Sequence, residues 1–210
     1  MKPFARAPFA ALVLVGCCAA APAYAHHAMG GETPTTVGQG LLSGLGHPII
    51  GIDHLAALVA VGLIAARFSR GLWMPVMWVA AMVAGAGLHL GRIDLPYGEG
   101  LVALSVIALG LIAALRPALP TGVVASLFAV GGFVHGFALA ESIVGAETTP
   151  LLAYLAGLVV CQSLLSLGAL LAARWLAGGR PEAPAGLRYA GFAIALVGAA
   201  AFALTLPGLA

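Results

Sequence analysis

The densest group of residues that could do chemistry lies in an apolar stretch, in the segment His-Pro-Ile-Ile-Gly-Ile-Asp-His at residues 47–54. Imidazole and carboxylate ligands together suit divalent first-row metals, in particular nickel, cobalt, copper and zinc. Ionisable side chains are costly inside a membrane and usually mark a functional site there. The segment therefore predicts a cation site on His47, Asp53 and His54. Purely structural roles are the alternative, with Asp53 protonated and bonded to a neighbouring backbone group.

The spacing of these residues predicts their geometry if the segment forms one helix. His47 and His54 would then lie on nearly the same face, about two turns apart. Asp53 would be rotated from His54 by about 100° and would flank the same polar stripe. Pro48 suits the first position of a helix, which would place His47 at the helix mouth. Gly51 would let a neighbouring helix or a cation approach closely, because it has no side chain.

Further ionisable residues follow in later apolar stretches and at their ends. His135 and Glu141 lie near the end of one such stretch, and we expect them to complete a transient metal site. A single intramembrane histidine such as His89 more often makes a hydrogen bond between helices. Charges at helix ends are commonly solvated, so the remaining acids are weaker candidates. The secondary metal-binding candidates are His26, His27, His89, Glu99 and Glu147.

The composition indicates a membrane protein. Hydrophobic residues make up 62% of the 210 positions and charged residues only 8%, whereas soluble domains carry about 25% charged residues. The apolar runs are continuous, which favours helices over the alternating strands of a barrel. No cluster of Lys and Arg indicates a nucleic-acid partner, and the three cysteines form no metal-binding or disulfide pattern. The predicted fold class is therefore all-α, a polytopic transmembrane helix bundle in contact with lipid.

Apolar runs of roughly 20 residues predict about six transmembrane helices in one domain over residues 26–210. These predicted helices cover residues 47–66, 73–91, 99–115, 120–140, 150–173 and 187–207. A periplasmic start places most basic residues in cytoplasmic loops, as the positive-inside rule requires. The cytoplasmic set is Arg67, Arg70, Arg116, Arg174, Arg180 and Arg188, whereas Arg92 lies on the opposite side. This topology predicts a bacterial inner-membrane protein with both mature termini in the periplasm and the histidines in the outer half.

The first 25 residues have the pattern of a secretory signal peptide, which is removed from the mature protein. A basic start and an apolar core precede Ala-Tyr-Ala at residues 23–25, a suitable cleavage site. Lipoprotein processing is the alternative, because Leu-Val-Gly-Cys at residues 14–17 resembles a lipoprotein cleavage box. Cleavage at the Ala-Tyr-Ala site would leave His26 and His27 at the amino terminus, where they could chelate a divalent cation.

The motif HPIIGIDHLAALVAVGL resembles the first-helix signature of the HupE/UreJ family, the nickel and cobalt permeases accessory to hydrogenase and urease. The family pattern of His, five residues and Asp-His matches His47, Asp53 and His54. A second pattern, His-Gly-x-Ala ending in Glu, is similar to residues 135–141, with alanine where the family often has glycine. Leu-Pro-x-x-Glu is similar to residues 95–99. The resemblance covers most of the mature chain, and it implies a helical permease that admits nickel or cobalt for metalloenzyme maturation.

The residues and the resemblance together predict a passive or secondary permease that carries Ni²⁺ or Co²⁺ and contains no prosthetic group. The chain has no nucleotide-binding loop of the P-loop type. Transport needs binding that is favourable but not tight, and a few imidazole and carboxylate ligands suit that requirement. Because protons compete with the metal for imidazole, we expect uptake to fall below about pH 6.

Two other functions would use the same residues. One is an intramembrane metalloenzyme, although the chain has neither an HExxH pair nor repeated Glu-x-x-His motifs. The other is a proton-relay or structural subunit of a respiratory complex. The sequence leaves the preferred metal, the driving force and the choice between monomer and homo-oligomer open. A link to hydrogenase or urease maturation would be indirect.

Overall fold

The computed structural model describes residues 32–178 and 184–206, and within these ranges every regular element is helical. The predicted signal peptide, with His26 and His27, lies outside the described residues. The main helices are α2 (Val37–Ile50), α3 (Ile52–Ala65), α4 (Met74–Leu90), α5 (Gly98–Leu115), α6 (Thr121–Ala140), α7 (Thr148–Ala177) and α8 (Ala185–Leu204). Two short 3₁₀ turns, η2 (Gly71–Trp73) and η3 (Glu141–Ile143), precede α4 and follow α6.

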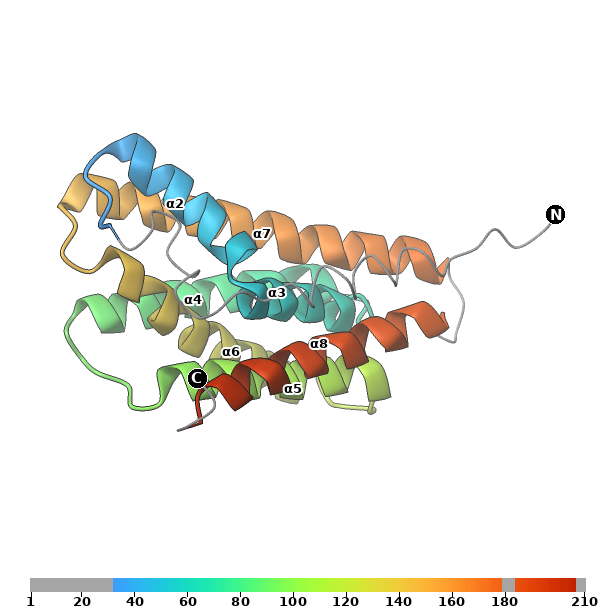
Figure 1. The fold of residues 1–210 in the computed structure, drawn as a ribbon. Coiled ribbons are helices and arrows are strands. Elements are labelled where there is room, and N and C mark those ends of the chain that lie inside the picture. The colour runs from blue at the N-terminus through green and yellow to red at the C-terminus, as the bar shows by residue number, and fades with distance from the viewer. Residues whose placement is uncertain (1–31, 179–183, 207–210) are drawn as a thin grey trace.

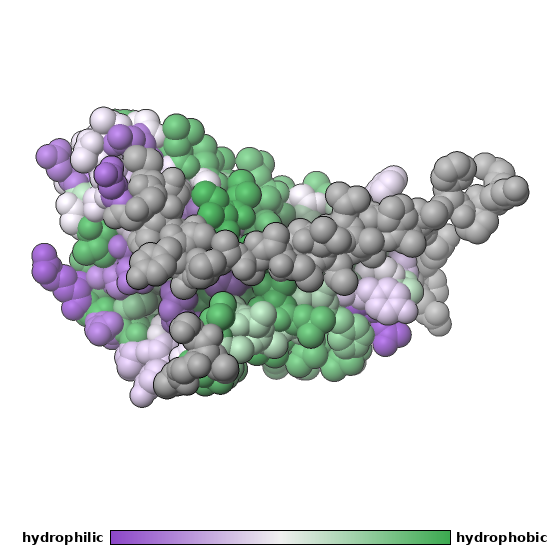
Figure 2. All heavy atoms as spheres, viewed as in Figure 1, coloured by the Kyte–Doolittle hydropathy of each residue, from purple (hydrophilic) through white to green (hydrophobic). Residues whose placement is uncertain are grey.

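The helices form one elongated bundle. Five of the described helices are long and apolar enough to cross a membrane, and α2 with α3 adds a sixth if the bent pair counts as one span. The long helices run along a common axis (Figure 1), with α3 packed against α4, α5, α7 and α8. Polar side chains gather toward the ends, and most of the coloured surface between them is hydrophobic (Figure 2). The prediction of an all-α, multi-pass membrane protein is therefore confirmed.

The first span differs from the prediction. A single helix over residues 47–66 was expected, but the helical structure starts at Val37 and bends by 75° at Gly51. Thr36 and Gln39 form a capping box that starts α2, since each side chain satisfies a backbone N–H of the other residue. Pro48 is therefore inside α2 rather than at a first helical position. His47 and His54 lie on different helices, so the predicted stripe along one helix face is wrong.

The break at Gly51 follows from local chemistry. Pro48 lies inside α2 and lacks the N–H that would bond the Gly44 carbonyl four residues earlier, which weakens the last turns of this helix, and α2 ends two residues after it. The Gly51 N–H still donates to the His47 carbonyl at 2.9 Å, while the Gly51 carbonyl accepts from the Leu55 N–H at 2.9 Å. Gly51 is thus the last donor of one helix and the first acceptor of the next. Its extended backbone, at φ −72° and ψ 97°, turns the chain between them.

Close backbone contacts at glycines hold the bundle together. A Cβ on Gly136 of α6 would collide with the Met82 carbonyl of α4, and one on Gly44 of α2 would collide with the Tyr154 carbonyl of α7. At Gly191 of α8 the obstacle is the backbone of α5. Small residues allow this approach, which gives van der Waals packing to helices surrounded by lipid.

The two ends of the bundle carry opposite charge patterns. We call one the acidic end; it carries Arg92 and the acids Asp94, Glu99, Glu141 and Glu147. We call the other the arginine end; it carries Arg67, Arg70, Arg116, Arg174 and Arg188. The first turn of α2 and the last turn of α8 both lie at the acidic end (Figure 1). Within the described ranges, this asymmetry matches the pattern that the positive-inside rule predicts for a membrane protein.

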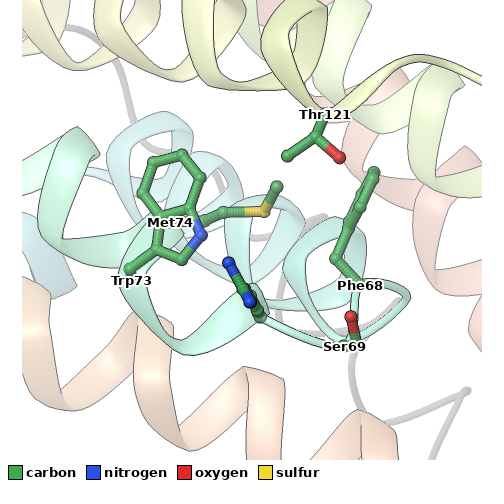
Figure 3. Close-up of a pocket in the computed structure, with 6 residues that line it drawn as sticks. Phe68, Ser69, Trp73, Met74 and Thr121 are labelled. Atoms are coloured by element: carbon green, nitrogen blue, oxygen red, sulfur yellow. The ribbon is translucent and has the colours of Figure 1, made fainter.

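Arginine side chains fasten the loops of the arginine end. Arg174 donates to the Phe68 carbonyl at 2.8 Å, and Arg67 donates to the Pro117 carbonyl at 2.8 Å. Partial burial, with a smaller contribution from nearby Arg116, lowers the pKa of Arg67 below its ordinary value. A cavity of about 310 Å³ opens at this end. Its lining, drawn in Figure 3, consists of Phe68, Ser69, Arg70, Trp73, Met74 and Thr121.

Candidate functional site

The break between α2 and α3 brings the three motif residues together. His47 lies in the last turn of α2, and Asp53 and His54 lie in the first turn of α3. All three are buried, with exposed fractions of 4%, 8% and 6%. The rings of His47 and His54 meet edge to face, with centroids 5.9 Å apart. The bend therefore achieves the grouping that the sequence analysis expected from a continuous helix.

His135 of α6 joins this group through His54. The Nδ1 atoms of the two rings are 2.8 Å apart, and the ring centroids are 4.9 Å apart. His135 is 1% exposed. Its other nitrogen, Nε2, lies 2.8 Å from the hydroxyl of Ser105 on α5. Three helices thus contribute to one line of hydrogen-bonding groups inside the bundle.

His47 is fixed by a second set of hydroxyl groups. Its Nδ1 lies 2.8 Å from the hydroxyl of Tyr154 on α7 and 3.1 Å from that of Ser142 in η3. The Tyr154 hydroxyl donates to the Leu139 carbonyl at 2.6 Å, and the Ser142 hydroxyl lies 3.0 Å from the Tyr154 oxygen. Tyr154 and Leu139 are 0% and 1% exposed. These contacts fix the ring of His47 from the side of α6 and α7.

Asp53 occupies the amino-terminal turn of α3. Its Oδ1 accepts a hydrogen bond from the backbone N–H of His54 at 2.8 Å. A carboxylate is favoured at this position, because the free N–H groups of a helix start carry partial positive charge. The same oxygen would lie 3.4 Å from a Cβ placed on Gly51, and the His54 Cδ2 atom would lie 2.8 Å from it. The Asp53 carboxylate and one edge of the His54 ring therefore both border the break.

We call His47, Asp53, His54 and His135 the histidine cluster. Trp78 covers this cluster on the side toward the arginine end. Its indole ring lies against His135, with centroids 5.0 Å apart, and is 0% exposed. The Trp78 Nε1–H donates to the Gln162 Oε1 at 3.1 Å. The Nε2 of Gln162 is buried without a hydrogen-bond partner among the described residues. The interior beyond Trp78 is mainly apolar, with Ile64, Met74 and Leu170 each 0% exposed.

The other described candidates take no part in the hydrogen bonds described above. Glu141 starts η3 and is exposed, as are Glu99 and Glu147. The ring of His89 packs edge to face on Phe137, with centroids 4.3 Å apart, and its buried Nδ1 has no hydrogen-bond partner among the described residues. No group of three or more His, Cys, Asp or Glu side chains is arranged to hold a metal ion in the part of the chain that the structure describes.

Sequence reasoning missed Ser105, Ser142 and Tyr154. Each is a single hydroxyl-bearing residue in or beside an apolar run, a pattern that usually carries no functional signal. The histidines and carboxylates were easier to find because such groups are rare in membrane helices. The donor types are those that nickel and cobalt accept, and the one described cysteine, Cys161, is single and buried.

Comparison with known proteins finds related sequences. The family model described as HupE / UreJ protein matches residues 12–201. The protein named HupE from Rhizobium leguminosarum bv. viciae is 36% identical over 168 residues, which cover 77% of this chain and 84% of the relative. No solved structure matches the chain.

Proposed function

Because the chain belongs to the HupE/UreJ family, we propose that it is a permease for divalent transition metal ions, with Ni²⁺ or Co²⁺ as the cargo. The ion would supply the maturation of metalloenzymes such as hydrogenase or urease. The metal is the substrate, and no prosthetic group takes part. The match to the family and to HupE supports a multi-pass membrane accessory protein, and the choice of ion is part of the proposal.

One observation carries the proposal: buried imidazoles and a carboxylate meet at a break in a membrane span. His47, Asp53 and His54 are each less than 9% exposed and border Gly51. Broken helices in transporters commonly form ion sites, because helix ends offer backbone groups without helical partners. The carboxyl end of α2 also carries partial negative charge, which favours a cation.

The donor set suits passage better than permanent binding. Imidazole nitrogens and a carboxylate oxygen would replace part of the hydration shell of the ion, and water would keep the remaining positions. A transported ion must be held firmly enough to enter and loosely enough to leave. His135 and Glu141 are the further metal contacts that the sequence analysis proposed. Asp53 and His54 are the residues on which the proposal depends most.

The charge asymmetry supports a direction for uptake. We place the acidic end in the periplasm and the arginine end in the cytoplasm of a bacterial inner membrane, in accord with the positive-inside rule. The exposed acids Glu99, Glu141 and Glu147 would then raise the local concentration of cations near the entrance. The histidine cluster lies in the half of the bundle nearer to this end.

Flux measurements in liposomes test the proposal. Purified protein is reconstituted, and the influx of Ni²⁺, Co²⁺, Zn²⁺ and Cu²⁺ is measured with an enclosed metal-sensitive dye. Saturable influx of Ni²⁺ or Co²⁺ is expected, with a loss of at least about 100-fold in Asp53→Asn and His54→Ala. Asp94→Asn is the matched control, because Asp94 is exposed at the acidic end. Folded wild-type protein that carries none of these ions would rule the proposal out.

A proton relay is the second candidate, because the hydrogen bonds from His54 through His135 to Ser105 form a continuous line. The line ends at the Val102 carbonyl, which accepts from Ser105 at 2.7 Å and cannot pass a proton on. A pH-sensitive dye in the same liposomes separates the two functions. Proton flux without any metal would favour the relay.

A further inference from the structure

We propose that His135 is a positioning residue for His54 rather than a ligand of the ion, and that Ser105 fixes its orientation. His135 would hold His54 with a proton on Nδ1 and leave the lone pair of His54 Nε2 for the cation. This inference rests on the proposed function, because it assigns roles within that metal site. It also changes the expectation that every histidine of the cluster binds the metal directly.

The argument starts at the Val102 carbonyl of α5. A carbonyl oxygen can only accept, so the single hydroxyl proton of Ser105 points to it across 2.7 Å. The Ser105 oxygen then has only lone pairs to offer to His135 Nε2, 2.8 Å away. His135 Nε2 must therefore carry the proton and donate. One backbone carbonyl thus sets the tautomer of a histidine on another helix.

The same logic extends from His135 to His54. A neutral imidazole has one N–H, so a proton on Nε2 of His135 leaves a lone pair on its Nδ1. His54 Nδ1 lies 2.8 Å from that lone pair and must donate to it. The lone pair of neutral His54 is then on Nε2. Metal-binding histidines in proteins are commonly held in this way, with the second ring nitrogen donating to a fixed acceptor.

The position of the His54 ring agrees with this assignment. The Nδ1 side faces His135, while the Cδ2 atom, which is bonded to Nε2, is the atom nearest to a Cβ position on Gly51, at 2.8 Å. The Asp53 Oδ1 lies 3.4 Å from the same position. The nitrogen that carries the lone pair therefore belongs to the ring edge beside the break, where the carboxylate also lies.

His135 has no nitrogen left for a metal in this arrangement. Its Nδ1 accepts from His54, its Nε2 donates to Ser105, and Trp78 covers its ring at a centroid distance of 5.0 Å. Binding of a metal at His135 would require at least one of these hydrogen bonds to break. Either His54 or Ser105 would then lose a buried hydrogen-bond partner, which is unfavourable inside the bundle.

X-ray absorption of the Co²⁺-loaded protein in detergent distinguishes a ligand from a positioning residue, because it counts the imidazoles bound to the metal. His54→Gln should remove one imidazole from that count. His135→Gln should leave the count unchanged, because an amide can accept from His54 through its oxygen and donate to Ser105 through its nitrogen. His89→Gln is the matched control, since the His89 ring packs on Phe137 outside the hydrogen-bonded line.

Affinity for Co²⁺, measured by calorimetry on the same samples, completes the test. Ser105→Ala should weaken binding by roughly 10- to 100-fold at an unchanged imidazole count, and Ser105→Thr should restore most of it. The loss of one imidazole in His135→Gln, or unchanged affinity in Ser105→Ala, would overturn the inference alone. Wild-type protein that binds neither Co²⁺ nor Ni²⁺ would overturn the proposed function together with it.

Discussion

The broken span α2–α3 and the unbroken helices α5 and α8 have different roles in the same bundle. The first span buries Ser43, His47, Asp53 and His54 around its bend. In contrast, α8 buries only Gly191, Ala193, Ile194 and Gly198. It packs closely along α5, where a Cβ on Gly191 would meet the backbone of Ala113 and Ala114. The α2–α3 span holds polar side chains that are costly to bury in a membrane, and the α5–α8 pair supplies close apolar packing.

The difference teaches where polarity is tolerated in this fold. Polar groups gather where a helix ends inside the bundle, because the free backbone groups and side chains there can satisfy one another. Apolar helices with glycine contacts surround that point and keep it away from lipid. Changes at the break should therefore act on transport, whereas changes in the α5–α8 contact should act on stability.

The largest expected effect comes from filling the break. Gly51→Leu places a side chain where His54 Cδ2 and Asp53 Oδ1 lie 2.8 and 3.4 Å from a Cβ. Because the added side chain displaces the groups proposed to bind the ion, we expect Ni²⁺ influx to fall by about 100-fold. Gly87→Leu is the control, since a Cβ on Gly87 meets nothing within 4 Å. Equal influx in the two variants would show that the break at Gly51 has no role in transport.

A methyl group added in the α5–α8 contact should lower stability and leave transport nearly unchanged. Gly191→Ala forces α8 away from the backbone of α5, and we expect the free energy of unfolding to fall by about 1–3 kcal/mol. Gly186→Ala in the same helix is the control, because its Cβ would meet nothing within 4 Å. Chemical unfolding in detergent measures the loss, and influx per folded molecule should stay near the wild-type value. A selective loss of influx would contradict the division of roles.

A smaller effect is expected from the hydroxyl that fixes His47. Tyr154→Phe removes a partner 2.8 Å from the Nδ1 of that ring and leaves it less firmly placed. We expect about tenfold slower Ni²⁺ influx with little change in the midpoint of thermal unfolding. Tyr189→Phe provides the comparison, because Tyr189 is 64% exposed on α8. If the two variants behave alike, Tyr154 has no role in the site.

The smallest effect concerns Arg174 of α7, which lies outside both regions. Arg174→Gln removes the hydrogen bond to the Phe68 carbonyl, and we expect a loss of about 1 kcal/mol in the free energy of unfolding. Arg70→Gln should change it by less than about 0.5 kcal/mol, because Arg70 is exposed. Unfolding of both variants under identical detergent conditions provides the measurement. A larger loss in Arg70→Gln than in Arg174→Gln would show that Arg70, and not Arg174, stabilises the arginine end of the bundle.

Much of the fold follows from hydropathy alone. The predicted helix at residues 99–115 differs by one residue at its start from α5, and the one at residues 120–140 differs likewise from α6. The first span could not be predicted equally well. The segment before His47 contains Gly38, Gly40, Gly44 and Gly46, which lower helix propensity. Its helix depends on the capping box at Thr36 and on packing against α7, which lies more than 100 residues later in the sequence.

The candidate site was predictable in its residue types and less so in its contacts. The sequence singled out His47, Asp53, His54 and His135, and the structure brings all four into one region. Ser105 and Tyr154 could not be predicted from the sequence, because one hydroxyl in an apolar helix has many structural uses. Glu141 is at the exposed start of η3, and the direction of a side chain at a helix end depends on the turn that follows. Spacing alone does not determine that turn.

The length of α7 connects the site to the thickness of the bilayer. Its 30 residues span about 45 Å, whereas the hydrocarbon core of a membrane is about 30 Å thick. Such a helix must tilt or extend beyond the core, at a cost of fractions of a kcal/mol for each ångström of mismatch. Tyr154 is fixed to this helix and contacts His47, so any tilt of α7 also acts on the ring of that histidine. We therefore expect a change in lipid chain length to alter the position of His47 in the proposed ion site.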